Sequence, residues 1–384
     1  MNTSGRLIKA LATIVLLSAA VGLIAIAVGS VLVPALSLGA CLFGASILLT
    51  RKEPEPEPPE VIEKIVVTSP GLAAYDLLEL IGSGSMGELW KAKHKALGRI
   101  VALKRIKSAV TDAEDLARFK REARATSDLR SPHTIEVFDF GVDQGALFYA
   151  MECLDGIDLQ RLIARDGPIT PARAIPILVQ ACHSLADAHA QGVVHRDIKP
   201  ANLMLCRYGL DLDFVKLLDF GLAKAVHKEG TEGALTREGV VLGSAAYIAP
   251  ESVKGSASVD GRADLYALGA IAFWLITGRL VFDLDKRIAM VRAHLSQTPP
   301  SAASISPFAV PRELDELIAG CLKKDPNQRP QSAAELADRL RAIRTTDRWS
   351  KQDAEAWWKT SGALADRDGP AAISRMPPQG TSAE

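Results

Sequence analysis

Hydrophobic residues are distributed unevenly along this chain, and the first 50 positions stand apart from the rest. Residues 10–50 contain no charged side chain, and as a single helix they would measure roughly 61 Å, about twice the thickness of the hydrocarbon core of a bilayer. The pattern therefore predicts a transmembrane hairpin of two helices, residues 10–28 and 31–50, bent at Gly29 and Ser30. The alternative interpretation is an uncleaved signal anchor followed by an apolar loop.

Basic residues flank this hairpin on both sides. Lys9 closes a short N-terminal segment, residues 1–9, and Arg51 and Lys52 follow the second helix. Because basic residues are enriched on the cytoplasmic side of membranes, both ends of the hairpin are expected in the cytoplasm. Residues 51–70 include a run of alternating Glu and Pro, which predicts an extended linker without chemistry of its own.

From Tyr75 onward, alternation of apolar and polar residues predicts the strands of a folded domain. Three strands are expected first, and the first two flank the glycine-rich stretch GSGSMG. A capping box at Thr111–Glu114 predicts a helix that ends near Arg130, and a hairpin around Asp143–Gly145 follows. Residues 75–152 are therefore predicted to form a small, β-rich lobe.

After Asp158 the pattern becomes mainly helical. Thr170 and Pro171 predict the start of a helix that ends at Gly192. The fold class expected is α+β, in which the small lobe precedes a larger helical lobe over residues 155–343, with a ligand cleft between them. Later helices are predicted for residues 263–277, 286–297, 312–322 and 332–343, the last opened by a capping box at Ser332–Glu335.

Composition excludes several classes of function. The chain has 45 basic and 45 acidic residues, so it lacks the net positive charge that would favour a nucleic acid partner. Its five cysteines are scattered and include no CxxC pair, which argues against a disulfide framework or a zinc site and favours a reducing compartment.

The glycine-rich stretch between the first two strands is a candidate phosphate site. Gly82, Gly84 and Gly87 lack side chains, so backbone N–H groups there can approach phosphate oxygens closely. A glycine-rich hairpin turn without a ligand is the simpler interpretation. Lys104 in the third strand gains a chemical role only if a carboxylate fixes it, and Glu122 in the next helix is the candidate.

The stretch HRDIKPAN at residues 195–202, followed by DFG at residues 219–221, indicates chemistry more strongly. Asp197 and Asn202 are five residues apart in a predicted loop, where a carboxylate can accept a hydroxyl proton while an amide oxygen binds a metal. Asp219 supplies a hard anionic oxygen of the kind that Mg²⁺ prefers. An ordered set of this kind is not expected by chance.

This ordered set resembles the eukaryotic-type (Hanks-type) serine/threonine protein kinases, in the membrane-anchored form found in bacteria, over residues 75–343. The resemblance implies the bilobal protein-kinase fold and transfer of the γ-phosphate of ATP to protein hydroxyls. It implies Asn202 and Asp219 as the ligands of Mg²⁺, or of Mn²⁺ in its place. The catalytic residues that it implies are Asp197 as the base, Lys199 near the γ-phosphate, Asn202 and Lys104.

The resemblance also assigns a set of residues to ATP. Met151 resembles the gatekeeper beside the hinge that binds adenine. The ATP-binding residues that the family implies are Ile81, Gly82, Ser83, Gly84, Ser85, Met86, Gly87, Glu88 and Leu89, Lys104 with its partner Glu122, and Glu152 and Cys153 of the hinge.

Three further matches separate protein kinases from small-molecule kinases that share the catalytic loop. Glu251 in the sequence APE ends the activation segment, and Arg329 resembles its ion-pair partner. Asp264 resembles the buried helix carboxylate that holds the catalytic loop. These roles are structural and not catalytic.

The expected function is that of a membrane-tethered serine/threonine kinase that autophosphorylates in its activation segment. Arg196 before the base is similar to kinases activated by a loop phosphate, for which Thr236 is the first candidate and Thr231 the second. The alternative is a catalytically weak pseudokinase that acts as a signalling scaffold, which the retained catalytic groups disfavour. Expected partners are protein substrates, ATP and the lipid bilayer, and a homodimer for phosphorylation in trans is left open.

A kinase needs cytosolic ATP and metal, and this decides the expected topology. The predicted localisation is the inner cell membrane, with a multi-pass hairpin and the kinase domain in the cytoplasm. Cleavage of a signal peptide ahead of Cys41 would instead export the kinase, and the apolar run is too long for a signal peptide.

The C-terminal tail, residues 344–384, places Trp349, Trp357 and Trp358 around a short polar helix. Packing of these indoles against the large lobe is favoured over a binding site for a partner. Beyond Ser361 the composition is rich in Gly, Pro and Ser, which predicts a disordered end to the tail.

Overall fold

The computed structural model of the protein describes residues 71–84, 87–109, 113–143, 145–220, 245–255 and 259–365. The predicted transmembrane hairpin, the linker, Ser85, Met86 and both candidate phosphosites lie outside these residues. Among the helices that are described, none combines the length and the apolar character needed to cross a bilayer. All of the described residues belong to one compact unit of the chain.

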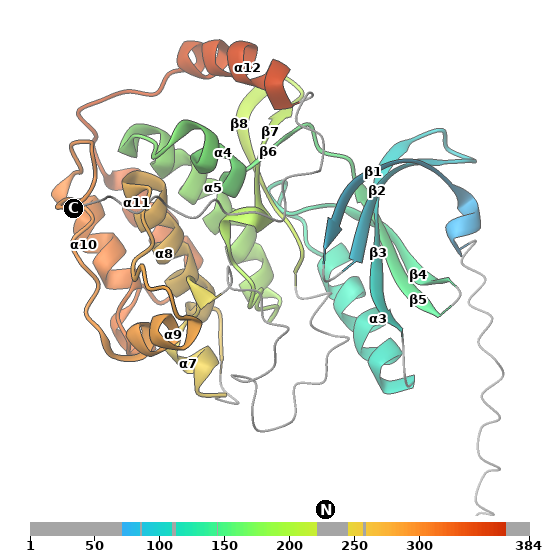
Figure 1. The fold of residues 1–384 in the computed structure, drawn as a ribbon, viewed down its shortest axis with the longest axis horizontal. Helices are drawn as coiled ribbons and strands as arrows, with labels where there is room; N and C mark the ends of the chain where they lie inside the picture. Colours follow the sequence, from blue (N-terminus) through green and yellow to red (C-terminus); the bar gives the residue numbers. More distant parts are fainter. Residues whose placement is uncertain are drawn as a thin grey trace, which may run out of the picture. The chain divides into compact units, whose positions relative to one another are not determined.

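The small lobe is an antiparallel sheet of five strands with one helix beside it, as the sequence predicts. The strands run in the spatial order β1-β2-β3-β5-β4 (Figure 1). A short 3-10 turn, η1 (Gly71–Ala74), precedes the first strand. The elements are β1 (Tyr75–Gly84), β2 (Gly87–His94), β3 (Ile100–Ala109), α3 (Ala113–Ser127), β4 (Val137–Asp143) and β5 (Ala146–Glu152).

Strand alternation divides the small lobe into two apolar layers. Tyr149 and Met151 of β5 pack in one cluster with Phe119 of α3. Phe148 and Ala150, the alternate residues of the same strand, pack on the opposite face. Because successive side chains of a strand point to opposite faces, this arrangement follows directly from the sequence pattern. The face that carries Tyr149 and Met151 is also the face covered by α3.

The large lobe combines a three-stranded sheet with helices. The sheet has the order β6-β7-β8, and its last two strands form an antiparallel pair after the catalytic loop. The strands are β6 (Gly156–Asp158), β7 (Leu203–Tyr208) and β8 (Asp211–Leu217). The helices are α4 (Leu159–Asp166), α5 (Pro171–Ala190), η2 (Pro200–Asn202), α7 (Pro250–Val253), α8 (Arg262–Thr277), α9 (Arg287–Ser296), α10 (Arg312–Cys321), η3 (Pro326–Gln328), α11 (Ala333–Ala342) and α12 (Lys351–Ala365).

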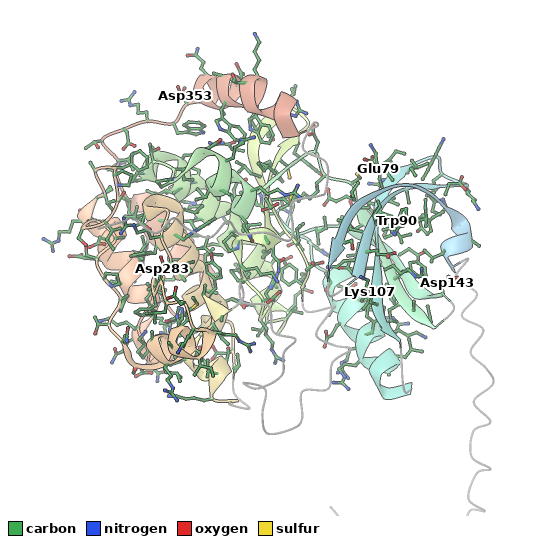
Figure 2. The ribbon with its side chains drawn as sticks, in the orientation of Figure 1. Glu79, Trp90, Lys107, Asp143, Asp283 and Asp353 are labelled. Atoms are coloured by element: carbon green, nitrogen blue, oxygen red, sulfur yellow. The ribbon has the colours of Figure 1, made fainter. Side chains whose placement is uncertain are left out.

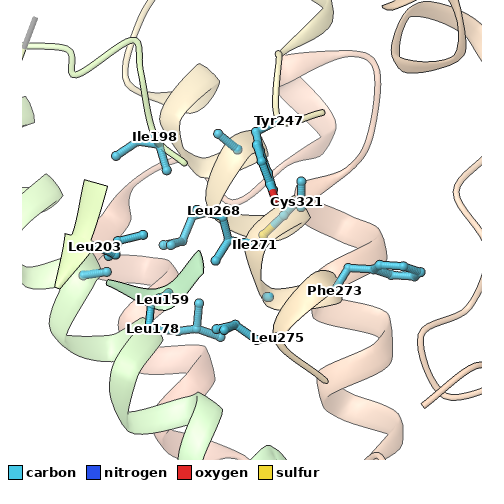
Figure 3. Packing of buried hydrophobic residues seen from close by; sticks show 14 of the residues in the cluster. Leu159, Leu178, Ile198, Leu203, Tyr247, Leu268, Ile271, Phe273, Leu275 and Cys321 are labelled. Carbon is cyan, nitrogen blue, oxygen red and sulfur yellow. The ribbon is translucent and has the colours of Figure 1, made fainter. Parts of the chain in front are cut away.

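Helix α8 forms the centre of the large lobe. It is buried around its whole circumference, as expected for a helix that is apolar on every side. Figure 3 shows Leu268 and Ile271 of α8 in the same apolar cluster as Leu203 of β7. A Cβ atom added at Gly269 would collide with the Cβ of Cys321, so glycine lets α10 approach closely. This helix also carries the buried Asp264 in its first turn.

Two predicted caps differ in detail from expectation. Ser332 caps α11 as predicted, since its hydroxyl accepts a hydrogen bond from Glu335 N at 3.1 Å. The Glu335 carboxylate, however, accepts from Gln331 N at 2.8 Å and not from the cap residue. Thr170 precedes α5, but its side chain makes no capping bond, and its carbonyl oxygen accepts from Arg173 N and Ala174 N at 3.0 Å.

The tail packs against the large lobe, which confirms the favoured prediction for its tryptophans. Helix α12 contacts β8 and β6, and Trp358 is only 4% exposed. The helix ends at Ala365, so the prediction of disorder directly after Ser361 was wrong. Ala and Leu in that last turn favour helix strongly enough to offset a single glycine. Asp353, labelled in Figure 2, accepts from Ser350 N and Ser350 Oγ in the first turn.

Candidate active site

One carboxylate of α8 anchors the backbone of the catalytic loop, residues 195–202. Asp264 accepts hydrogen bonds from His195 N and Arg196 N, both at 2.9 Å, and is 1% exposed. His189 at the end of α5 adds a third contact, 2.8 Å from Nε2 to the same carboxylate. Arg196 has a φ of 62°, a conformation that surrounding structure must enforce for a residue other than glycine. Asp264 therefore fixes the backbone that carries Asp197.

His195 connects the catalytic loop to the end of β8. Its side chain is fully buried, and Nε2 lies 2.8 Å from the carbonyl oxygen of Leu218. Its ring packs against Phe220 with the ring centroids 4.6 Å apart. Burial lowers the pKa of this histidine, although Asp264 and the Leu218 carbonyl oppose that shift. A neutral His195 is therefore a structural link between the two motifs.

Asp197, the predicted base, is oriented by its neighbours in the same loop. Lys199 Nζ donates to Asp197 Oδ2 at 2.8 Å. Asn202 Nδ2 donates to the carbonyl oxygen of Asp197 at 2.8 Å and to Oδ2 at 3.2 Å. The structure thus brings together three of the four predicted catalytic residues within one short loop, with the carboxylate held by an ammonium and an amide.

Asn202 and Asp219 form a donor set that fits a magnesium ion. Leu218 N donates to the carbonyl oxygen of Asn202 at 2.9 Å, which holds the end of η2 next to the residues that follow β8. The described hydrogen bonds of the Asn202 side chain use Nδ2, so Oδ1 is the side-chain atom left for a metal. No group of three or more carboxylate, thiol or imidazole ligands exists among the described residues. One carboxylate and one amide, completed by phosphates and water, suit Mg²⁺.

Asp219 is bound on both of its oxygens. Lys104 Nζ donates to Oδ2, and the hydroxyl of Tyr149 donates to Oδ1. Burial raises the pKa of this carboxyl, but Lys104, Tyr149 and Lys199 outweigh it and hold the pKa below its ordinary value. Asp219 also has a positive φ of 56°. The carboxylate is therefore ionised at neutral pH and held in one orientation.

Glu122 lies half-buried on α3, as expected of a residue that faces the small lobe. Its predicted pairing with Lys104 stays a prediction, because the described contact of Lys104 is with Asp219. Lys104 is 15% exposed and also lies 5.7 Å from the centroid of the Tyr149 ring. The lysine therefore lies close to one predicted metal ligand.

Apolar residues surround the predicted adenine position. Ile81, Leu89 and Leu154 pack against the cluster that contains Met151, the predicted gatekeeper. A Cβ atom added at Gly87 would collide with the carbonyl oxygen of Arg105. Glycine at this position therefore allows β2 to approach β3 at the end of the glycine-rich stretch.

The structure describes residues 82–84 and 87 of the glycine-rich stretch. Lys107, labelled in Figure 2, donates from Nζ to the carbonyl oxygen of Gly84 at 3.2 Å. Gly82 pairs with Leu89, and Ser83 with Glu88, across the turn. The stretch lies between β1 and β2, the two strands that were predicted to flank it, and its binding to phosphate stays a prediction.

The two predicted hinge residues differ in their surroundings. Glu152 is 8% exposed, and its carboxylate accepts from Lys216 Nζ at 2.6 Å and from Glu136 N at 2.9 Å. Its side chain is thus engaged within the protein, and its N–H donates to the carbonyl oxygen of Glu136 at 3.0 Å, so its role in binding adenine stays a prediction. Cys153 is exposed as a whole residue. Its sulfur is nevertheless partly buried, and this burial raises the pKa of the thiol.

The ion pair predicted for the end of the activation segment is present. Arg329 is 3% exposed and donates through two nitrogens to Glu251, at 2.7 and 2.8 Å. A fork of this kind is geometrically specific as well as strong. A surface hollow of about 530 Å³ lies elsewhere and is lined by Ser127, Asp128, Leu129, Arg130 and Gln191. We place the site by the chemistry of its side chains, because that hollow contains none of the predicted residues.

Sequence reasoning missed three residues that the site uses. Tyr149 binds Asp219, His189 binds Asp264, and Lys216 binds Glu152. One signal was available for Tyr149, since it lies two residues before the predicted gatekeeper and therefore on the same face of β5. His189 and Lys216 act across long sequence separations, and local pattern gives no indication of them.

Comparison with known proteins agrees with this geometry. The profile described as "Protein kinase domain" matches residues 75–340. The chain is 40% identical over 272 residues to the serine/threonine-protein kinase pkn3 of Myxococcus xanthus, covering 70% of this chain and 50% of that protein. It is 39% identical over 264 residues to the serine/threonine-protein kinase PknD of Mycobacterium tuberculosis, covering 68% and 38%.

A third relative is the serine/threonine-protein kinase PknB of Mycolicibacterium smegmatis, 37% identical over 277 residues, covering 70% of this chain and 42% of that protein. The chain thus spans half or less of the length of these curated relatives. The matched segment contains every residue of the catalytic loop and of the Asp219 cluster. The chain belongs to the protein kinase domain family, with bacterial serine/threonine-protein kinases of the Hanks type as its relatives.

Proposed function

We propose that this protein is an active serine/threonine kinase that transfers the γ-phosphoryl group of ATP to hydroxyl groups of proteins. The observation that carries the proposal is the fixed orientation of Asp197 by Lys199 and Asn202. A scaffold that only keeps the fold has no need of an oriented base. The relatives whose names describe serine/threonine kinases support the same conclusion.

Each group of the site has a role in this reaction. Asp197 orients the incoming hydroxyl and accepts its proton, while Lys199 carries positive charge next to the transferred group. Asn202 Oδ1 and the Asp219 carboxylate would hold Mg²⁺, or Mn²⁺ in its place. The metal supplies positive charge that offsets the negative charge of the phosphates. Ile81, Leu89 and Met151 provide the apolar surface for adenine.

The test is the substitution Asp197→Asn in the full chain, with Asp155→Asn as the matched control. Asp155 is an exposed residue of the same lobe that pairs with Arg207. Loss of the base is expected to lower phosphoryl transfer to a generic protein substrate by about 10²–10⁴-fold. The control is expected to keep the wild-type rate. Equal incorporation of labelled phosphate by the wild type and Asp197→Asn would exclude the assignment.

We also propose autophosphorylation in the activation segment, with Thr236 as the first site and Thr231 as the second. Arg196 next to the base supports this, because an arginine there can pair with a loop phosphate. Mapping of phosphorylated residues in wild type and Asp197→Asn tests it. Phosphate at these threonines in the wild type alone is the expected result. A homodimer would make the rate of this reaction depend on protein concentration.

The proposed location is the inner membrane, with the kinase domain in the cytoplasm. Support comes from the uncharged residues 10–50 and from the basic residues on both sides of them. A reporter protein fused after Glu60 tests the topology. A reporter that works in the cytoplasm is expected to be active at this position. Activity only of a reporter that works outside the membrane would contradict the hairpin.

A further inference from the structure

Tyr149 is a buried tyrosine whose hydroxyl reaches the predicted metal ligand. The side chain is 1% exposed and lies in the apolar cluster beside α3. Its hydroxyl donates to Asp219 Oδ1, while Lys104 donates to Oδ2. A buried hydroxyl costs free energy unless it is hydrogen-bonded, and a phenylalanine would fill the same space without that cost. The hydroxyl therefore needs an explanation beyond packing.

The register of the sheet fixes where this hydroxyl lies. Tyr149 of β5 is directly opposite Lys104 of β3, so the two side chains share one face. Met151, the predicted gatekeeper, is opposite Ala102 on the same face. Because strands hold side chains at fixed positions, the donor on Tyr149 moves only if the sheet moves. The two donors to Asp219, Lys104 and Tyr149, thus lie on neighbouring strands whose register fixes their positions.

The geometry leaves room for a metal ion on the carboxylate. Each carboxylate oxygen has two lone pairs. Tyr149 and Lys104 each occupy one lone pair on a different oxygen, so each oxygen of Asp219 keeps a second one. A tyrosine donor is neutral and, unlike a lysine, adds no positive charge that would repel a cation. It can therefore remain in place when a metal binds.

We propose that Tyr149 is a positioning residue, whose hydroxyl holds the Asp219 carboxylate in the orientation that binds the divalent metal of a nucleotide–metal complex. The inference rests on the proposed function, since it concerns the metal of the same reaction. Hydrogen-bond partners of metal ligands commonly contribute about 10- to 100-fold to metal affinity. Tyr149 touches neither substrate in this account and acts only through Asp219.

The experiment compares Tyr149→Phe with Tyr75→Phe in the full chain. Tyr75 is a matched control, because it is 5% exposed in the same sheet and its hydroxyl donates to Asp139 at 3.2 Å. Calorimetry measures ADP binding in EDTA and then across a titration of Mg²⁺. Tyr149→Phe is expected to bind ADP normally in EDTA, within about twofold. It is expected to need about 10- to 100-fold more Mg²⁺ for the gain in affinity, whereas Tyr75→Phe behaves as the wild type.

A double-mutant cycle with Asp219→Asn identifies the route of the effect. In the Asp219→Asn background, Tyr149→Phe is expected to change the Mg²⁺ dependence no further. An effect that persists there would mean that the hydroxyl acts through another group, and it would overturn the inference. Equal Mg²⁺ dependence in wild type and Tyr149→Phe would also overturn it, as would a stronger response to Mg²⁺ in the variant.

A second variant separates the hydroxyl from the fold. Tyr149→Met removes the hydroxyl and the ring, so it costs more stability than Tyr149→Phe, but it is expected to shift the Mg²⁺ dependence equally. If Tyr149→Met shifted the Mg²⁺ dependence more than Tyr149→Phe, in step with its greater loss of stability, the proposal would be overturned. If wild type shows no gain in ADP affinity with Mg²⁺, the proposed function itself fails. If wild type gains and Tyr149→Phe gains equally, only the role of Tyr149 fails.

Discussion

Two aspartates at opposite ends of β8 meet similar partners and serve different purposes. Asp213 and Asp219 both have positive φ angles, 54° and 56°, and both bind a cation and an aromatic donor. Asp213 accepts two bonds from Arg173 at 2.9 and 3.0 Å, and one indole N–H each from Trp349 and Trp358 at 2.9 Å. These four bonds use both lone pairs of each oxygen. Asp219 has only two such described partners, and half of its accepting capacity is left for a ligand.

The tail is what completes the Asp213 cluster. Arg173 is 4% exposed, and its guanidinium lies 4.2 Å from the ring centroids of both Trp349 and Trp357. Stacking on aromatic rings suits the flat guanidinium of arginine better than the ammonium of lysine. These tryptophans lie beyond the residues that match the kinase family, so the tail is a structural addition to that fold. A carboxylate whose lone pairs are all hydrogen-bonded stabilises the fold, as Asp213 does, whereas a carboxylate with lone pairs left over can also bind a ligand, as proposed for Asp219.

The largest expected effect comes from removing the half-bonded carboxylate. Asp219→Asn is expected to lower phosphoryl transfer by at least about 10³-fold, because it removes the anionic metal ligand. The free energy of unfolding should fall by only about 1–2 kcal/mol, since Lys104 retains some access to solvent. Rates of ATP consumption and denaturant unfolding measure the two effects. If Asp219→Asn kept more than about a tenth of the wild-type rate, the contrast drawn between Asp219 and Asp213 would be wrong.

Asp213→Asn is expected to have the opposite profile. It leaves Arg173 buried without its charge partner, which costs about 3–5 kcal/mol of unfolding free energy. The folded fraction should keep the wild-type rate within about threefold, because Asp213 lies at the far end of β8 from the site. Unfolding by denaturant and a rate normalised to folded protein test this. Loss of the rate with unchanged stability would show that the two ends of β8 are coupled.

The indole bonds to Asp213 provide a smaller and more local test. Trp358→Phe keeps most of the buried ring but removes one N–H donor to a charged acceptor, which is expected to cost about 1–3 kcal/mol. Trp357→Phe is the matched control, since Trp357 is only partly buried and donates to Asp166 at the surface. Its expected cost is below about 1 kcal/mol. Equal costs for the two variants would mean that the Asp213 bond has no special role.

The smallest effect concerns pH and Asp166. Burial raises the pKa of this carboxyl, but the bonds from Arg165 and Trp357 outweigh it and hold the pKa below its ordinary value of 3.8. The stability that this supplies is present above that value and is lost as pH falls through the lower pKa of the folded protein. The loss should stay below about 1 kcal/mol, because the pair is partly exposed. Trp357→Phe should reduce it, which unfolding curves at pH 6 and pH 3 can measure.

Much of the small lobe could be predicted from alternation alone. The strand pattern around GSGSMG and the hairpin at Asp143–Gly145 give β1, β2, β4 and β5 with correct order along the chain. The catalytic loop could also be predicted, because Asp197 and Asn202 are only five residues apart and a short loop must keep them close. Where the prediction failed, as for the helical residues after Ser361, the helix preference of Ala and Leu in the last turn outweighed the single glycine there.

The sequence by itself determined which chemical groups are available and which of them lie close together along the chain. Tertiary structure alone decided the partners of the two aspartates, because Tyr149 is 70 residues from Asp219, and Trp349 and Trp358 are 136 and 145 residues from Asp213. Such contacts form only after sheet register and helix packing have closed long loops, and no local pattern records that closure. Asp213 in β8 and Asp219 just after it are the same residue type, and their surroundings decide which one stabilises the fold and which one is left to bind a ligand.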